Sequence, residues 1–182
     1  MTFLISFIVI LLFCVFIYNL LVQKRNQVKN INSSVDTQLQ KRYDLIPNLV
    51  SSVKQYLKHE KSILEQISAL RSNAMNALNN KDKFDLNNQI SKFLGEIKIA
   101  VEAYPDLKAN QNVMHLQVSL NEIEEQISAA RRAYNSCVMD YNNSCEMFPT
   151  NIFAKIFNFK KAEFFYAEES VKKPPKVADL FE

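Results

Sequence analysis

The sequence predicts an all-α protein in which an N-terminal transmembrane helix continues into an antiparallel, four-helix-bundle-like domain of three long helices and a short fourth. Three observations carry this prediction. Residues 1–23 contain no charged side chain, as expected of a helix that crosses a bilayer. Residues 113–148 place apolar side chains at alternating steps of three and four, the pattern of a helix with one apolar seam. Gly95 is the only glycine, so the tight turns of an all-β protein have almost no residue to build them.

Residues 1–23 form the predicted membrane anchor. Crossing the hydrocarbon core takes about 20 apolar residues, and Ile, Leu, Phe and Val dominate this stretch. No Lys or Arg precedes it and no small-residue cleavage site closes it, so we expect an uncleaved, single-pass anchor. Lys24, Arg25 and Lys29 follow at once, and the positive-inside rule then places the bundle in the cytoplasm and the N-terminus outside. The alternative topology places the bundle in the periplasm or outside the cell.

Residues 24–166 are predicted to form the helical bundle. Apolar residues keep a spacing close to 3.6 from residue 26 to residue 78, so we expect the anchor helix to continue unbroken to that point, with a kink at Pro47. Residues 79–83 form a polar connector to a second helix, which ends before Pro105. A loop with one helical turn then leads to the third helix.

The third helix carries the apolar seam and ends against Pro149. The seam residues are Val113, Leu116, Leu120, Ile123, Ile127, Ala130, Tyr134, Cys137, Tyr141 and Phe148. A short aromatic-rich helix is expected within residues 151–159, and residues 167–182 are predicted to form a mobile, Pro- and Lys-containing tail. If the three long helices leave, return to and leave the bilayer in turn, the segment 155–166 starts about 50 Å from the lipid, where it would cap the third helix.

Several short motifs occur in order along the chain. They are the run from Arg42 to Val50, His59-Glu60, the run from Glu102 to Lys108, the run from Glu124 to Asn135, Tyr141-Asn142 and Phe148-Pro149. In order and spacing they resemble the LemA family over nearly the whole chain, with departures mainly after Phe159. The resemblance implies a membrane-anchored antiparallel helical bundle. It implies no activity, because the family's molecular role is not established, and no catalytic residue carries over.

The residues themselves display no catalytic or metal-binding pattern. His59-Glu60 is the first half of a zinc-protease motif, but Ile63 stands where the second histidine is needed. A di-iron site would need two Glu-x-x-His motifs, which the chain lacks. A single glycine rules out phosphate-binding and dinucleotide-binding loops. Cys137 lies on the apolar seam, where packing is a better explanation than nucleophilic catalysis. We therefore expect no metal, no cofactor and no enzymatic activity.

Polar residues on or beside the apolar faces are the candidate site. They are Arg42, Glu60, Glu102, Arg131, Tyr134, Asn135 and Tyr141. The favoured interpretation is a buried polar network that fixes helix register, in which Arg131 meets Glu102 or Glu60 and the tyrosine hydroxyls reach facing helices. Two alternatives stay open: a groove that grips a partner's peptide, and an enzyme whose site is assembled from Glu60, Glu102, Arg131 and Tyr134.

The expected function is that of a membrane-anchored scaffold or adaptor in the cytoplasmic (inner) membrane of a bacterium. Its expected partners are the lipid bilayer and other membrane proteins, and a homo-oligomer would bury any seam left uncovered. Nucleic acid is not an expected partner, because the net charge is only +3 and acidic and basic residues are interspersed along the helices.

Overall fold

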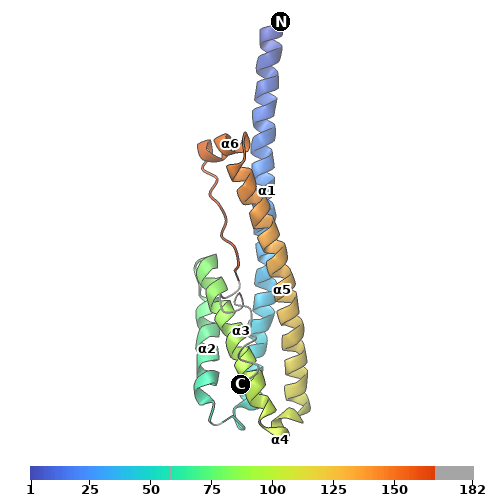
Figure 1. Cartoon of the computed structure of the whole chain (residues 1–182), viewed down its shortest axis with the longest axis vertical. Coiled ribbons are helices and arrows are strands. Elements are labelled where there is room, and N and C mark those ends of the chain that lie inside the picture. The colour runs from blue at the N-terminus through green and yellow to red at the C-terminus, as the bar shows by residue number, and fades with distance from the viewer. Residues whose placement is uncertain (58, 167–182) are drawn as a thin grey trace, which may run out of the picture. The chain divides into compact units, whose positions relative to one another are not determined.

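A computed structural model describes residues 1–57 and 59–166, and this part of the chain contains helices and no strand. The helices are α1 (Thr2–Val53), α2 (Lys61–Met75), α3 (Asn80–Glu102), α4 (Pro105–Lys108), α5 (Gln111–Glu146) and α6 (Thr150–Ile156) (Figure 1). The all-α class is therefore confirmed. The predicted tail, residues 167–182, lies outside the described residues.

The described chain divides into two compact units. The first contains residues 1–40 and 125–164, and the second contains residues 41–124 together with Phe165 and Tyr166. Both α1 and α5 contribute to the two units, because the division falls inside each helix. In the first unit the end of α5 lies beside the first part of α1, and α6 follows it (Figure 1). The apolar residues from Met1 to Phe16 are mostly exposed, and α1 is the one described helix long and apolar enough to cross a membrane.

Helix α1 ends well before the point that the apolar spacing predicts. Pro47 lies inside α1, as expected, but the helix stops at Val53 and α2 begins at Lys61. The amide groups of Tyr56 and Leu57 both donate to the Val53 carbonyl, which closes the last turn. Leu57 is buried within this turn, so apolar spacing continues through the chain reversal. The expectation of one helix over residues 26–78 is therefore wrong.

The second unit contains four longer helical segments that run in alternate directions, namely the end of α1, then α2, α3 and the start of α5, together with the short α4 (Figure 1). Its core is formed by buried aliphatic side chains from all of them, among them Ile46, Leu49, Ile67, Ile90, Ile97 and Leu120. The connector lies at residues 76–79 and not at the predicted 79–83, because α2 ends at Met75 and Asn79 caps α3, accepting a hydrogen bond from the amide of Asp82 at 2.8 Å. Pro105 opens α4, which supplies the expected helical turn.

Most of the predicted seam on α5 is buried. Val113, Leu120, Ile123, Ile127, Tyr134 and Tyr141 are buried, and Leu116, Ala130 and Cys137 are half-buried. The prediction that Phe148 belongs to the seam is wrong, because α5 ends at Glu146 and the Phe148 side chain is 80% exposed. Val138 is fully buried in place of the half-buried Cys137, so the contact face drifts by one residue near the end of the helix.

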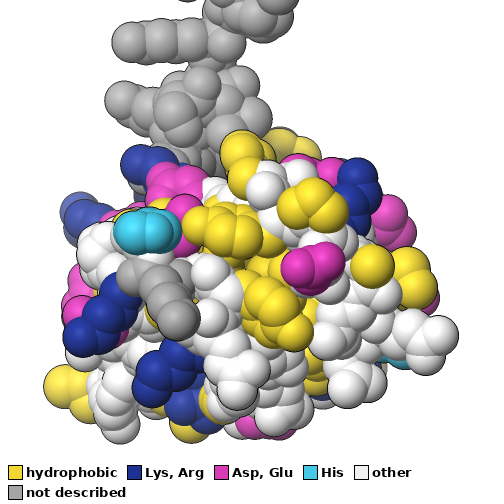
Figure 2. Space-filling view, turned by 90° about the horizontal axis from the view of Figure 1, so that it is seen from below, with side chains coloured by type: hydrophobic (Ala, Val, Ile, Leu, Met, Phe, Trp, Pro, Cys, Tyr) yellow, Lys and Arg dark blue, Asp and Glu magenta, His cyan; other side chains and the backbone are white. Residues whose placement is uncertain are grey.

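The end of the second unit that carries α4 presents a mixed surface. Acidic, basic and hydrophobic side chains lie interspersed on the part of this face that the structure describes (Figure 2). A surface with interspersed charges offers no broad basic patch for a phosphate backbone. The absence of a nucleic-acid partner nevertheless stays a prediction.

Gly95 provides a test of the helix interior. It is exposed in the middle of α3, and a Cβ added there would meet nothing within 4 Å. We expect Gly95→Ala to raise the free energy of unfolding by about 0.5–1 kcal/mol, since alanine loses less backbone entropy on folding. Urea unfolding of the detergent-solubilised full chain, followed by circular dichroism, measures this. Lys92→Ala, one turn earlier and also exposed, should change stability by less than about 0.5 kcal/mol; a loss of stability in Gly95→Ala would contradict the analysis.

Candidate functional site

The most deeply buried polar side chain of the described chain is Arg42 of α1, which is fully enclosed in the second unit. Its Nη1 donates to the Glu124 carboxylate of α5 at 2.5 Å and to Ser91 Oγ of α3 at 2.7 Å. Its Nη2 donates to the backbone carbonyl of Asn87 at 3.2 Å and to the Asn87 side-chain oxygen. One guanidinium group therefore joins α1, α3 and α5.

The partners of Arg42 also bond to one another. Asn87, buried like Arg42, donates through Nδ2 to the Tyr43 hydroxyl at 2.6 Å and to the Lys83 carbonyl at 2.8 Å. Ser91 Oγ lies 3.1 Å from Glu124 Oε2. Arg71 of α2 donates through Nε to the Tyr43 carbonyl at 2.6 Å, which brings the fourth helix into contact with the same turn of α1. We call Arg42, Tyr43, Asn87, Ser91 and Glu124 the Arg42 cluster.

The cluster leaves little bonding capacity for a ligand. Four of its hydrogen bonds use Arg42 donors, and among the described residues only Arg42 Nε is buried there without a partner. Glu124 is the one charged member that reaches solvent, with its side chain 35% exposed. An Arg with a close carboxylate offsets the cost of burial only when further hydrogen bonds complete its shell. The arrangement is that of a structural ion pair.

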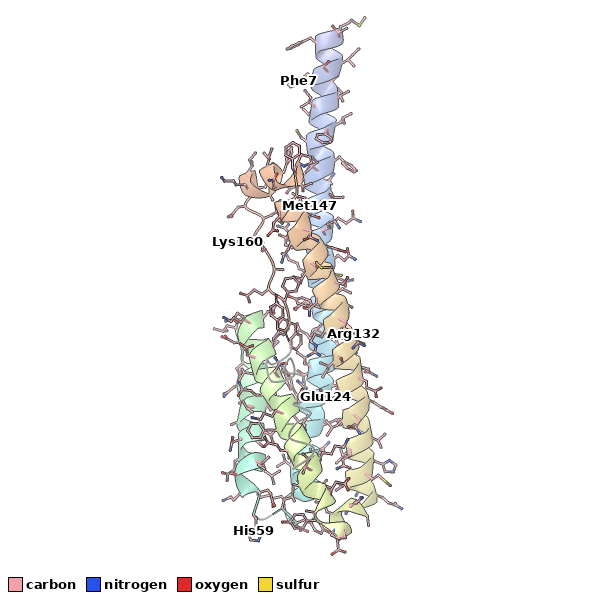
Figure 3. All side chains as sticks on the ribbon, in the orientation of Figure 1. Phe7, His59, Glu124, Arg132, Met147 and Lys160 are labelled. Atoms are coloured by element: carbon pink, nitrogen blue, oxygen red, sulfur yellow. The ribbon has the colours of Figure 1, made fainter. Side chains whose placement is uncertain are left out.

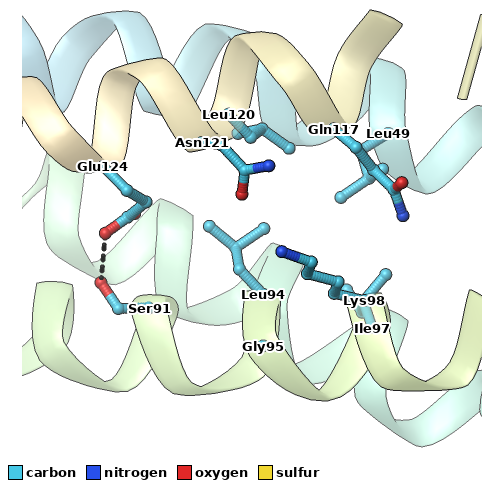
Figure 4. A pocket seen from close by; sticks show the side chains of 10 residues that line it. All are labelled: Leu49, Ser91, Leu94, Gly95, Ile97, Lys98, Gln117, Leu120, Asn121 and Glu124. Carbon is cyan, nitrogen blue, oxygen red and sulfur yellow. Dashed lines mark hydrogen bonds between the residues drawn. The ribbon is translucent and has the colours of Figure 1, made fainter. Parts of the chain in front are cut away.

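A small pocket lies beside the cluster between α3 and α5, with Leu49 of α1 also lining it (Figure 4). Its volume is about 170 Å³, and it is lined by Leu49, Ser91, Leu94, Gly95, Ile97, Lys98, Gln117, Leu120, Asn121 and Glu124. Figure 4 shows Glu124 bonded to Ser91 at one end of it. Sites for drug-sized ligands enclose about 300–1,000 Å³, so this pocket suits ordered water or one side chain better than a substrate.

The first unit contains a second polar arrangement, formed by Tyr134, Tyr141 and Asn142 of α5. The Tyr134 hydroxyl donates to the Glu163 carbonyl at 2.9 Å, and the Tyr141 hydroxyl donates to the Lys160 carbonyl at 2.8 Å. Asn142 accepts from the Ala162 amide and donates to its carbonyl, both at 2.9 Å. We call these three residues the tyrosine ladder. They satisfy backbone groups of the non-helical segment 157–164, which returns along α5.

The spacing of the ladder matches the segment that it holds. Seven residues of α-helix rise about 10.5 Å between Tyr134 and Tyr141. Three residues of extended chain, from Lys160 to Glu163, span about 10–11 Å. Burial raises the pKa of Tyr141 to about 12, which keeps its hydroxyl protonated and able to donate at any physiological pH. The tyrosine hydroxyls therefore reach backbone carbonyls of this segment.

The remaining predicted residues lie in separate places. Glu60 accepts from the Tyr104 hydroxyl at 3.3 Å, and partial burial, together with the Glu60 charge, raises the pKa of Tyr104. Glu102 forms an exposed ion pair with Lys108 at 2.5 Å. Arg131 and Asn135 are half-buried on α5 and belong to the first unit, whereas Glu60 and Glu102 belong to the second. A single network joining all seven residues stays a prediction.

Sequence reasoning missed most of the Arg42 cluster. Asn87 lies three residues after Phe84 and three before Ile90, both of which are buried. The sequence therefore signals Asn87 only as a polar residue at a position where the helical spacing predicts an apolar one. Glu124, one residue after the seam position Ile123, looks like one of several solvated charges. Tyr43 lies in phase with the buried Leu39 and Ile46, as a core residue would, and Ser91 carries no such signal. Of the cluster, only Arg42 is among the polar residues that the sequence singles out.

The described residues contain no group of three or more His, Cys, Asp and Glu side chains placed to hold a metal ion. The cysteines are free thiols, all half-buried. Burial raises the pKa of the Cys145 thiol, so it is a poor nucleophile at neutral pH.

The Arg42 cluster predicts a large cost for removing its one carboxylate. Glu124→Gln leaves a buried guanidinium without a counter-charge and should lower the free energy of unfolding by about 3 kcal/mol. Urea unfolding of the full chain in detergent measures this loss. Glu102→Gln is the matched control, because its pair is exposed and should be worth less than about 1 kcal/mol. Equal, small losses in both variants would contradict the structural role of the cluster.

Comparison with known proteins places these residues in a family. The model of the LemA family matches residues 31–178. Over 89 residues the chain is 33% identical to magnetosome proteins MamQ 2 and MamQ 1 of Paramagnetospirillum magneticum and 27% identical to MamQ of Magnetospirillum gryphiswaldense. Each match covers 49% of this chain and 33% of the relative, so the chain spans about a third of the length of these relatives. The match to the family model includes the Arg42 cluster and the tyrosine ladder. The chain belongs to the LemA family.

Proposed function

We propose that the protein is a membrane-anchored helical scaffold or adaptor that binds other membrane proteins and performs no chemistry of its own. One observation supports this proposal above all: the buried polar side chains bond to one another and to backbone carbonyls. Four hydrogen bonds from the Arg42 guanidinium go to α3 and α5, and the tyrosine hydroxyls of the ladder donate to carbonyls of segment 157–164. Residues that hold helices in place are not free to bind or activate a substrate.

The continuous helix α1 adds to this support. It contains the apolar stretch that suggests membrane anchoring, and it continues without interruption through Arg42 to Val53. The match to magnetosome proteins covers a third of their length, so it supports a shared helical region rather than a role in magnetosomes.

Photo-crosslinking in native membranes tests the adaptor. A photoreactive amino acid at Leu78, which is 101% exposed, or at Ile99, 74% exposed, should capture a reproducible set of membrane proteins. A second copy of the chain is captured with them if the protein self-associates. The same group at Phe7 of the anchor is the control, because it samples bystanders in the bilayer (Figure 3). Recovery of the same proteins from Phe7 as from Leu78, or of the lone chain from every position, would contradict the proposal.

We further propose that the anchor lies in the cytoplasmic membrane with the second unit in the cytoplasm, since Lys24, Arg25 and Lys29 follow the apolar stretch. In a chain whose native cysteines are replaced by alanine, Leu78→Cys should react with a membrane-impermeant maleimide only after lysis. Thr2→Cys is the reciprocal control and should react in intact cells whose outer membrane, where present, is permeabilised. The opposite pattern would place the bundle on the outer face.

A further inference from the structure

Helix α6 and the residues on either side of it carry a group of exposed apolar side chains. Its members are Met147, Phe148, Ile152, Ile156 and Phe157, exposed by 63%, 80%, 48%, 68% and 52%. All five belong to the first unit and fall within eleven consecutive residues, 147–157. We call this group the α6 patch. Soluble proteins rarely expose a concentrated set of large apolar side chains to water, so we expect another molecule to cover the α6 patch.

The α6 patch lies against the membrane anchor. Ala154 of α6 forms a buried cluster with Ile17 and Leu21 of α1, and Cys145, Phe153 and Phe159 pack on that cluster. The ring of Tyr18 meets Phe157 edge-on, with centroids 4.9 Å apart, and Phe159 at 6.0 Å. Figure 3 shows Met147 and Lys160 at this level of α1, with Phe7 further along the anchor. The start of segment 155–166 therefore lies beside the anchor helix, which contradicts the expectation that it starts far from the end of the anchor.

The contact occurs at the edge of the apolar stretch. Ile17 and Leu21 lie six and two residues before the predicted end of the anchor at Gln23, which corresponds to about 9 Å and 3 Å of helix rise. An anchor of about 20 residues fills the hydrocarbon core, so these positions fall at one acyl-chain boundary. Tyr18, like the aromatic residues enriched at membrane interfaces, lies at the same level.

Basic residues lie near the patch in the sequence and on α1. Lys24 and Arg25 follow the apolar stretch of α1, and the Arg25 guanidinium lies 4.9 Å from the centre of the Phe159 ring. Lys155 on α6 and Lys160 after it are exposed, and Lys161 pairs with Glu146. Apolar side chains beside the anchor with cations next to them are the composition of an interfacial membrane contact.

We propose that the α6 patch is a second membrane contact, inserted into the boundary between headgroups and acyl chains of the bilayer that the anchor crosses. Phe148, Ile152 and Ile156 contact acyl chains, and Lys155 and Lys160 lie among lipid phosphates. Ile152 and Ile156 are one turn apart and share a face of α6, whereas Ala154 faces α1. The inference rests on the anchor crossing the bilayer and assigns the patch to lipid, not to a protein partner.

Tryptophan fluorescence tests this directly, because the native chain contains no tryptophan. Phe148→Trp and Ile156→Trp are made singly in the full chain and reconstituted into vesicles of phosphatidylcholine and phosphatidylglycerol. Emission should shift to shorter wavelength than in unfolded protein. Replacing part of the phosphatidylcholine with its acyl-brominated form should then quench both variants, because bromine quenches tryptophan only at close range. Helical circular dichroism confirms that each variant is folded, and either one alone suffices for the test.

Two controls make the outcome decisive. Phe7→Trp reports the anchor and should be quenched by brominated lipid, whereas Arg132→Trp, fifteen residues and about 22 Å of helix before Met147, should not be quenched (Figure 3). Long-wavelength, unquenched emission at residues 148 and 156 would mean that the patch faces water. Short-wavelength emission without quenching would mean that protein covers it, such as a second copy. Either result overturns the proposal, while loss of quenching at Phe7 would instead overturn the anchor on which it rests.

Discussion

The buried guanidinium of Arg42 is the interaction on which the second unit depends. A charge without solvent exposure is tolerated only where its counter-charge and hydrogen-bond acceptors are placed to match it. Here the acceptors come from Asn87 and Ser91 of α3 and from Glu124 of α5. Apolar side chains can slide past one another at small cost, but this set of directional bonds cannot. The cluster therefore fixes the register of the helices, while apolar packing supplies most of the stability.

The first unit follows the same logic with neutral groups. Segment 157–164 has no helix of its own to satisfy its backbone, so its carbonyl and amide groups need partners elsewhere. The tyrosine ladder supplies three of these partners from α5. Both units thus use the polar side chains that interrupt an apolar helix face to place another segment. Polar groups that are used in this way are not available for chemistry, which is the physical basis for proposing a scaffold.

The sequence predicts the helical class, the anchor, the α5 seam and the burial of Arg42 because each depends on local periodicity or composition. It fails at the turn after Val53. Val53, Leu57 and Leu64 are all buried and stay in phase with one helix, and neither glycine nor proline marks the reversal. Without this turn, the prediction has one helix where the structure has two antiparallel ones. The predicted direction of every later helix is therefore inverted. That single error places α6 at the wrong end, although its own sequence is interpreted correctly as short, helical and aromatic.

The corrected direction changes what the exposed residues of α6 mean. At the predicted place, far from the bilayer, these residues would only cap the end of a helix. Beside the anchor they form a surface at the level of the lipid. A seven-residue helix is too short to bind a bilayer strongly by itself. The contacts with Ile17 and Leu21 remove that difficulty, because they hold α6 next to the anchor at a high effective concentration of membrane. A few apolar side chains are then enough to keep it inserted. With two lipid contacts in place of one, the first unit would lose much of the freedom to tilt and rotate that a single helix leaves it, and a scaffold with a fixed orientation presents the same face to each partner.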